Sequence, residues 1–237
     1  MPCKICGNQK TVRSHVIPKA FAHDVRDGEK HVIGVSRHRI GGKPSQGGIF
    51  SDRLLCSDHE AKTSAADTYA IEFVRRIANT WSGARDTTTL EVQNPYPDLI
   101  RRFAITTIWR EVHADPLGEI GLGPYENDVL DYIFHNAVAP DWPVIVQRTN
   151  FFVRLNNPID FNLHPYRVKF ADRNGWALTV AGAAFFVISD RRGLAKRFSS
   201  GRADICDPAL VTVSEQLPFT EVGALKNILT SAMRAVG

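Results

Sequence analysis

Two short pairs of metal-binding side chains stand in the first sixty residues, with one histidine between them. Cys3 and Cys6 form the first pair, Cys56 and His59 form the second, and His15 lies between. Two intervening residues let both side chains of a pair reach one ion from a tight turn or from the first turn of a helix. Four nitrogen and sulfur ligands close a tetrahedral zinc site without an open position. We therefore predict structural Zn²⁺ here, in preference to a disulfide or to unrelated cysteines.

The elements that must position these residues differ along the chain. Residues 1–60 are rich in glycine and basic residues, with a weakly alternating stretch over 12–18 that predicts one strand of a short hairpin and a glycine-rich loop over 41–48. Helical periodicity starts near Glu60, where Ala65, Tyr69, Phe73 and Ile77 follow at intervals of four, and it ends near Gly83. We expect residues 1–83 to form a zinc-binding module.

The remaining residues, 84–237, predict an α+β domain of unknown role. Helices are expected over 98–137, with Asp98 at the first N-terminus, and a closing helix over 220–236. Runs of β-branched and aromatic residues predict strands between 143 and 190, including one over 151–155, with a hairpin turn at 172–175. The expected fold class is α+β: an N-terminal zinc-bound ββα module, then helices and a mainly antiparallel sheet.

Composition narrows the class of protein. The chain has 237 residues, of which 43% are hydrophobic, enough for one large domain or two modest ones. No apolar run approaches the roughly 20 residues that span a bilayer, and the first residues lack the apolar core of a signal peptide. With four cysteines in a chain of this kind, we expect a cytoplasmic protein with reduced thiols and no membrane partner.

Basic charge is concentrated in the segment that carries the metal-binding pairs. Residues 1–62 hold eleven Lys and Arg against six Asp and Glu, a formal charge of +5, whereas residues 63–237 hold eighteen against nineteen, a formal charge of −1. A localised basic surface attracts a phosphate backbone. The sequence therefore favours nucleic acid as a partner, with a simple solvated basic face as the alternative.

The order of motifs resembles a known family. The cysteine pair, the Ser-His-Val-Ile-Pro run at 14–18, the glycine-rich loop and the Leu-Leu-Cys-x-x-His-Glu run at 54–60 resemble HNH (His-Me finger) endonucleases that contain a zinc-binding treble clef. The chain is more closely similar to a family of largely uncharacterised bacterial HNH-like proteins, through the same Ser-His-Val-Ile-Pro run, Gly-Ile-Phe-Ser-Asp at 48–52 and Ile-Trp-Arg at 108–110. The resemblance covers about residues 3–75 and reaches 112 through the last motif.

The resemblance implies roles for individual residues. Cys3, Cys6, Cys56 and His59 are the expected zinc ligands. His15 takes the position of the general base, which removes a proton from the attacking water, and imidazole suits this role because its pKa lies near neutral pH. A single Mg²⁺ or Mn²⁺ ion is expected to stabilise the leaving oxygen.

Two positions depart from the HNH pattern. Ser14 replaces a metal-binding Asp, and Glu60 replaces a metal-binding His. Glu60 is a fair ligand for a hard cation, and Asp52 is a candidate second carboxylate. The predicted catalytic residues are therefore His15, Glu60 and Asp52. Each also has a structural interpretation: His15 as a packing residue, Glu60 as a charge at a helix N-terminus, and Asp52 as a turn residue.

Two functions follow from this pattern. The first is a metal-dependent HNH-like endonuclease that cuts DNA or RNA, with DNA favoured, in a defence or mobile-element system. The second is a catalytically inactive zinc module that binds nucleic acid or a protein partner. The two changed positions favour the second function, whereas the joint presence of His15 and Glu60 favours the first.

Overall fold

The computed structural model describes residues 2–26, 32–34, 43–45, 48, 50–51, 53–82, 88–114, 120–149, 160–170, 172–194 and 201–214. The N-terminal elements are β1 (Ser14–His15), α1 (Lys19–Asp24), β2 (Val32–Gly34), β3 (Lys43–Ser45) and β4 (Phe50–Ser51). The elements that follow are α2 (Ser57–Ser82), β5 (Thr89–Val92), α3 (Pro97–Ala114), the 3-10 helix η1 (Gly123–Tyr125), α4 (Glu126–His135), β6 (Val144–Thr149), β7 (Leu163–Phe170), β8 (Arg173–Val180), β9 (Ala183–Ile188) and β10 (Ala209–Ser214).

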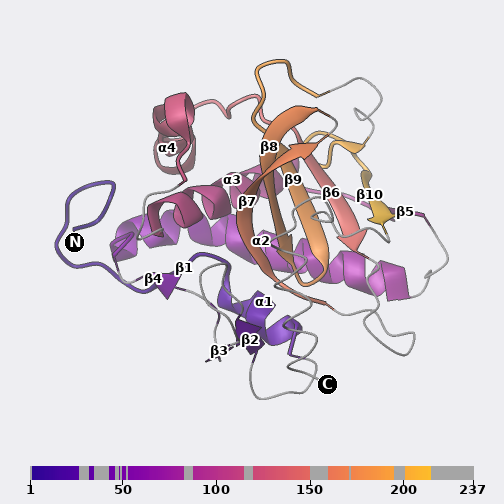
Figure 1. The fold of residues 1–237 in the computed structure, drawn as a ribbon, viewed down its shortest axis with the longest axis horizontal. Coiled ribbons are helices and arrows are strands. Elements are labelled where there is room, and N and C mark those ends of the chain that lie inside the picture. Colours follow the sequence, from indigo (N-terminus) through magenta and orange to yellow (C-terminus); the bar gives the residue numbers. More distant parts are fainter. Residues whose placement is uncertain are drawn as a thin grey trace.

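The long helix α2 crosses the molecule (Figure 1), and it carries His59 in its first turn, directly after Cys56. Asp58 and Glu60 lie in its first turn, where negative charge complements the helix dipole. Its predicted apolar stripe is buried at Tyr69, Phe73 and Ile77, whereas Ala65 at the edge of the stripe is exposed. The helix begins at Ser57, slightly before the predicted start near Glu60.

Helices α3 and α4 match the two helices expected over 98–137. The helix α3 begins at Pro97, whose fixed φ and missing N–H suit a first helical position. Asp98 therefore lies in the first turn rather than before it. Asn136 ends α4 in the left-handed conformation, with φ of 56°.

A six-stranded sheet in the order β5-β10-β6-β9-β8-β7 packs against the helices (Figure 1). Its pairs are antiparallel except that β10 runs parallel to β6. Alternate residues of β8 face opposite sides of the sheet: Trp176 and Leu178 join the larger core with the helices, whereas Ala177 joins a smaller cluster with Phe186. The expected α+β class with a mainly antiparallel sheet is confirmed.

The predicted turn at 172–175 is wrong in its register. The pairing of Phe170 with Arg173 closes the β7–β8 hairpin earlier, and Asp172 adopts a φ of 63° there. Gly175 lies inside β8, where an added Cβ atom would collide with the carbonyl oxygen of Val187. This glycine therefore permits close approach of β9 rather than a turn.

Strand pairing in the N-terminal segment is short. The stretch expected to be a strand over 12–18 forms only β1, which pairs antiparallel with β4 and places Ser14 opposite Ser51 and His15 opposite Phe50. The predicted strand over 151–155 and the predicted helix over 220–236 lie outside the described residues, as do residues 41–42 and 46–47 of the predicted loop over 41–48. Lys43–Ser45, in the middle of that loop, instead form β3, which pairs antiparallel with β2.

One hydrophobic core joins residues on both sides of the predicted boundary between 83 and 84. The ring of Phe103 on α3 lies 5.9 Å from Phe21 on α1 and 5.5 Å from Phe185 on β9, measured between centroids. The division into two domains stays a prediction, and the N-terminal segment shares its packing with the sheet. In the described part of the chain, none of the helices has the length and apolarity to cross a membrane.

Candidate metal centre and histidine site

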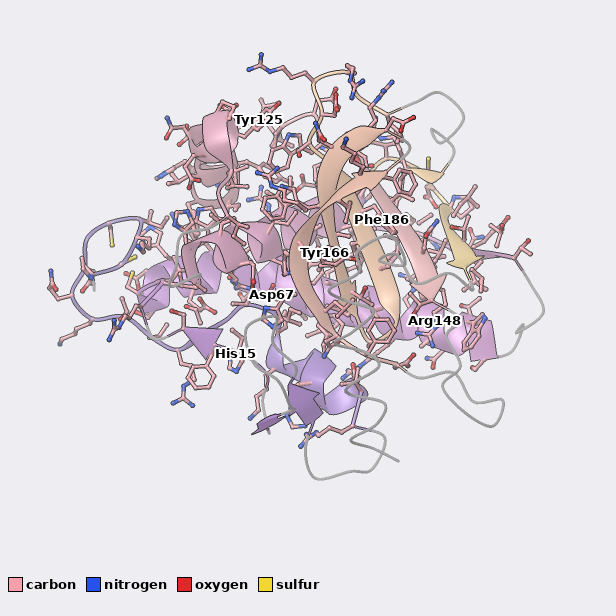
Figure 2. The ribbon with its side chains drawn as sticks, viewed as in Figure 1. His15, Asp67, Tyr125, Arg148, Tyr166 and Phe186 are labelled. Atoms are coloured by element: carbon pink, nitrogen blue, oxygen red, sulfur yellow. The ribbon has the colours of Figure 1, made fainter. Side chains whose placement is uncertain are left out.

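The two metal-binding pairs meet in space although fifty residues separate them in the chain. The ligand atoms of Cys3, Cys6, Cys56 and His59 all lie within 4.8 Å of one another. The Sγ atoms of Cys6 and Cys56 are 3.8 Å apart, and Nδ1 of His59 lies 3.8 Å from Sγ of Cys3 and 3.2 Å from Sγ of Cys56. Figure 2 shows sulfur atoms inside the N-terminal loop, next to the start of α2.

These distances fit a tetrahedral zinc ion. Zn–S bonds of about 2.3 Å and Zn–N bonds of about 2.0–2.1 Å place two sulfurs about 3.8 Å apart, and a sulfur and a nitrogen about 3.6 Å apart. A disulfide needs a sulfur–sulfur distance of about 2.05 Å, and no disulfide joins any of the four cysteines. The Cys/His cluster can therefore hold a metal ion such as zinc.

Backbone hydrogen bonds shape the loop that brings the first pair to the second. The N–H of Cys3 donates to the carbonyl of Asn8, and the N–H of Gly7 donates to the carbonyl of Cys3. Gly7 has a φ of 72°, which glycine adopts without steric cost. The N–H of Lys4 donates to Leu54 at 2.9 Å, which ties this loop to the residues before Cys56.

The polar surroundings of the cluster adjust its ionisation. Burial raises the pKa of Cys3, but backbone N–H groups of Cys6, Ile5 and Cys56 outweigh this effect and lower that pKa to about 7. Burial lowers the pKa of His59, and Lys62 lowers it further. Thiolate and neutral imidazole are the forms that bind a metal, so both shifts favour binding near neutral pH.

His15 lies on β1, the strand whose Ser14 hydrogen-bonds Glu60 in the first turn of α2. Its ring contacts Phe50 with 5.8 Å between centroids, and the guanidinium of Arg13 lies 4.0 Å from the centroid of the Phe50 ring. Desolvation lowers the pKa of His15, and the charges of Lys19, Arg110 and Arg13 lower it further. The imidazole is therefore neutral at neutral pH and can accept a proton.

A partly buried ionic network connects β1, α2 and α3. The hydroxyl of Ser14 donates to Oε2 of Glu60 at 2.8 Å. Arg110, whose side chain is 1% exposed, lies 3.6 Å from Oε1 of Glu60 and donates to both carboxylate oxygens of Asp67, at 3.1 and 2.9 Å. It also donates to the hydroxyl of Thr63 at 2.6 Å. Glu60, Thr63 and Asp67 follow at helical spacing, which presents all three to α3.

The structure treats the three predicted catalytic residues differently. His15 and Glu60 come to the same region, because Ser14, next to His15, bonds Glu60 directly. The Glu60 side chain is 28% exposed and does not simply point to solvent. Asp52 lies outside the described residues. Within the described ranges, the Cys/His cluster is the only group of three or more His, Cys, Asp or Glu residues placed to share an ion.

Sequence reasoning missed the partners of His15. Asp67 raises the pKa of His15, against the larger lowering effects, and so lies close enough to interact with its charge; Figure 2 labels both residues. The sequence shows Arg110 only as the last residue of the Ile-Trp-Arg motif, with no local sign of its partners. Residues 60, 63 and 67 of α2 are polar and share one face of the helix. This pattern was the sequence signal that could have predicted a buried cation on the facing helix.

Comparisons with protein-family models, with curated proteins and with solved structures find no match to this chain. The fold and the site define its class: an α+β protein with a Cys/His cluster near its N-terminus that could hold a metal ion.

Proposed function

We propose that this chain is an HNH-like endonuclease that hydrolyses phosphodiester bonds of nucleic acid, with DNA as the favoured substrate. Structural zinc bound by Cys3, Cys6, Cys56 and His59 organises a treble-clef-like module around His15. The observation that carries the proposal is the setting of His15: an imidazole of lowered pKa near the positive charges of Lys19, Arg110 and Arg13, on the strand whose Ser14 donates to Glu60 at the start of α2.

This setting suits phosphodiester hydrolysis. A neutral imidazole removes a proton from the attacking water, and cationic side chains attract the phosphate. Arg13 and Lys19 stand on the same segment as His15 and are the residues to contact the phosphate. Arg110 is buried and forms an ion pair with Asp67. It therefore lowers the pKa of His15 through its charge and does not contact the substrate.

The divalent cation is a separate part of the proposal. Glu60 is hydrogen-bonded to the strand that carries His15, which makes it the first candidate ligand for a divalent cation. Both of its carboxylate oxygens are already engaged, however: one accepts a hydrogen bond from Ser14, and the other faces Arg110. The described residues do not complete a second three-ligand site. We therefore assign no step to Mg²⁺ or Mn²⁺ and test the requirement directly.

The experiment compares cleavage by the zinc-loaded wild type with that by His15→Ala. Supercoiled plasmid, single-stranded DNA and RNA are each incubated with Mg²⁺, with Mn²⁺ or with chelator. The expected result is cleavage by the wild type and a loss of about 10²-fold or more in His15→Ala, the usual contribution of a general base. His23→Ala is the matched control, because His23 is an exposed histidine on the nearby helix α1. Equal cleavage by wild type and His15→Ala contradicts the proposal.

A second function is favoured by the bond between Ser14 and Glu60. This bond and the guanidinium of Arg110 already engage the carboxylate, as expected where a catalytic cation is no longer bound. In that case the chain binds nucleic acid without cutting it. Binding that weakens steeply with salt, is retained in His15→Ala and is reduced in Lys19→Gln, without cleavage under any cation, is the expected result.

A further inference from the structure

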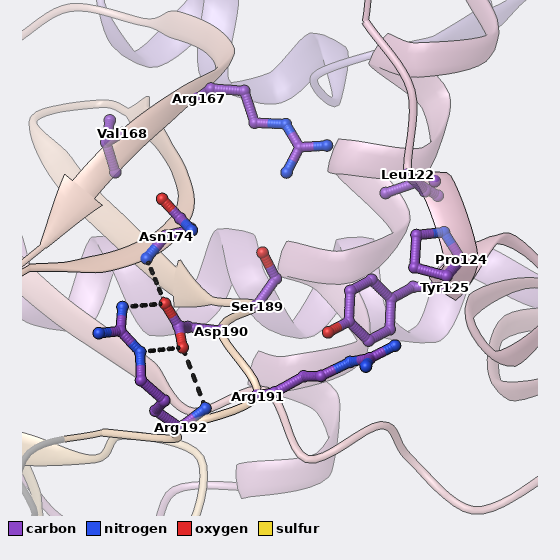
Figure 3. Close-up of a pocket in the computed structure, with 12 residues that line it drawn as sticks. Leu122, Pro124, Tyr125, Arg167, Val168, Asn174, Ser189, Asp190, Arg191 and Arg192 are labelled. Atoms are coloured by element: carbon purple, nitrogen blue, oxygen red, sulfur yellow. Dashed lines mark hydrogen bonds and ion pairs between the residues drawn. The ribbon is translucent and has the colours of Figure 1, made fainter.

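A cavity of about 610 Å³ opens between η1 and the edge of the sheet, on elements other than those that hold His15. Its walls come from residues 122–125, from β7 and β8, and from the loop after β9. Figure 3 shows the side chains of Arg167, Arg191 and Tyr125 around one space, with Ser189 between them. Binding sites for small molecules have volumes of about 300–1,000 Å³.

Arg167 brings a cation to this cavity without a carboxylate partner. Its guanidinium lies 4.0 Å from the centroid of the Trp176 ring, and it donates to the backbone carbonyl of Gly121. Within the described ranges it forms no ion pair. Desolvation lowers its pKa, and no neighbouring carboxylate offsets this effect. A guanidinium has five N–H donors, so several remain for an anion in the cavity.

The loop after β9 supplies a second cation, Arg191, to the cavity. Asp190 accepts two hydrogen bonds from the side chain of Arg192, at 2.9 and 2.7 Å, and another from the backbone N–H of Asn174 at 3.0 Å. Together these bonds lower the pKa of Asp190 and keep it ionised, and the paired guanidinium of Arg192 offsets its negative charge. Arg191, between these two residues, is exposed and has no hydrogen bond or ion pair to the rest of the described chain.

The opposite wall combines apolar and hydrogen-bonding groups. The ring of Tyr125 stands edge-on to Trp142, 5.2 Å away, and adjoins Pro124. Ser189 is 6% exposed, and neither its hydroxyl nor that of Tyr125 has a hydrogen-bond partner among the described residues. The side-chain amide of Asn174 is likewise free in the described structure. A flat aromatic wall with free donors and acceptors suits a nucleobase.

We infer that this cavity binds a nucleotide, with its phosphate between Arg167 and Arg191 and its base against Tyr125. A phosphate accepts charge-assisted hydrogen bonds from both guanidinium groups, which are otherwise without anionic partners here. A neighbouring hollow of about 380 Å³ shares Tyr125, Asp190, Arg191 and Arg192 with the cavity and adds Asp128 and Asp141, whereas Arg167 lines only the cavity. These carboxylates repel an anion, which places the phosphate at the Arg167 end. The inference does not depend on the proposed cleavage at His15.

Isothermal titration calorimetry of the full, zinc-loaded chain tests this site with 5′-AMP, 5′-GMP, adenosine and inorganic phosphate. A 5′-phosphorylated tetranucleotide tests whether the bound nucleotide is free or the end of a strand. We expect saturable binding of the monophosphates that is at least about tenfold tighter than binding of adenosine, because the lost hydrogen bonds are charge-assisted. Tetranucleotide affinity equal to or greater than that of 5′-AMP assigns the site to strand ends, and weaker affinity assigns it to free nucleotides.

Two variants separate this site from general attraction to positive charge. Arg191→Gln is expected to weaken 5′-AMP binding about tenfold, and it is expected to fold because Arg191 has no partner in the described structure. Lys169→Gln removes the same charge from an exposed position on β7 outside the cavity and should leave affinity unchanged. No saturable binding of 5′-AMP, equal weakening by both variants, or equal affinity for 5′-AMP and inorganic phosphate overturns the inference. His15→Ala should bind 5′-AMP normally, so failure of the nuclease proposal and failure of this one are distinguishable.

Discussion

Cys3 and Cys56 are buried, at 3% and 2% exposure, and their sulfur atoms face other sulfur and nitrogen atoms rather than a hydrophobic pocket alone. Without a bound ion, thiol groups this close together stabilise the fold little through their mutual contacts. Once deprotonated they repel one another, so a cation at the centre accounts for their arrangement. The exposed Cys6 completes the set and leaves one side of the cluster open to solvent.

Replacement of one ligand tests this arrangement. Cys3→Ser is expected to reduce bound zinc from about one ion per chain and to destabilise the N-terminal segment strongly, because structural zinc contributes on the order of 10 kcal/mol to folding. Metal analysis and urea unfolding measure the two effects. Cys206→Ser is the control, because Cys206 lies outside the cluster; a metal-free wild type that folds normally contradicts the assignment.

The lowered pKa of His15 makes a prediction about pH. Since the folded protein holds this imidazole below its ordinary value of 6.5, a base function persists at pH 6.5 and is lost only as pH falls through the lower folded-state pKa. The same shift means that the unfolded chain binds more protons over this range, so stability falls with decreasing pH from about 6.5. NMR titration of the His15 ring and the acid limb of cleavage should agree. A ring pKa above 6.5 refutes the electrostatic account.

Helices α2 and α3 are joined by a polar contact where most of their interface is apolar. Arg110 meets Asp67, Thr63 and Glu60 there. Desolvation of an arginine costs several kcal/mol, and the acceptors of its two terminal nitrogens offset part of that cost, whereas Nε has no hydrogen-bond partner among the described residues. Arg110 can reach all of these partners in only one relative arrangement of the two helices and β1. The contact therefore specifies how these elements pack together.

Breaking this network should destabilise the protein far more than breaking a surface pair. Arg110→Met is expected to cost about 3–5 kcal/mol of unfolding free energy, because it leaves the mostly buried carboxylate of Asp67 without its cationic partner. Arg75→Met removes an exposed bidentate pair with Asp24 and should cost at most about 1 kcal/mol. Urea denaturation measures both. Adding Asp67→Leu to Arg110→Met should recover part of the loss, and equal effects of the two single variants contradict this account.

The shared core implies that the N-terminal module and the sheet stabilise each other. Phe103 is fully buried and contacts the rings of Phe21 and Phe185, which belong to the two parts. Neither part buries its apolar surface without the other, so their unfolding should be coupled.

Phe103→Ala tests this coupling in the whole molecule. The substitution is expected to cost about 3–5 kcal/mol through lost burial and a residual cavity. Zinc release and tryptophan fluorescence should shift together to lower urea concentration, with coincident midpoints. Two separate transitions, with zinc release unaffected by the substitution, would show that the N-terminal module unfolds independently.

Much of the fold was predictable because its signals are local. The spacing of ligands within each pair, the apolar stripe of α2 and the β-branched runs of β6 to β9 each depend on a few neighbouring residues. The ends of the strands were harder to predict, because they depend on how neighbouring strands pair. Gly175 follows an asparagine and suggested a turn, but the close approach of β9 places it within a strand.

The meeting of the two ligand pairs was also inferable from sequence, because four ligands of matching chemistry satisfy one ion best. The surroundings of His15 were not. Its partners Asp67 and Arg110 lie on helices far along the chain, and their hydrogen bonds depend on how α2 packs against α3. The cavity beside Arg167 likewise arises where β7, β8, η1 and the loop after β9 converge. The sequence by itself determined the ligand pairs and the local secondary structure, because both depend on residues close together in the chain. The tertiary structure decided which side chains from distant segments come together, because burial and charge act through space rather than along the chain.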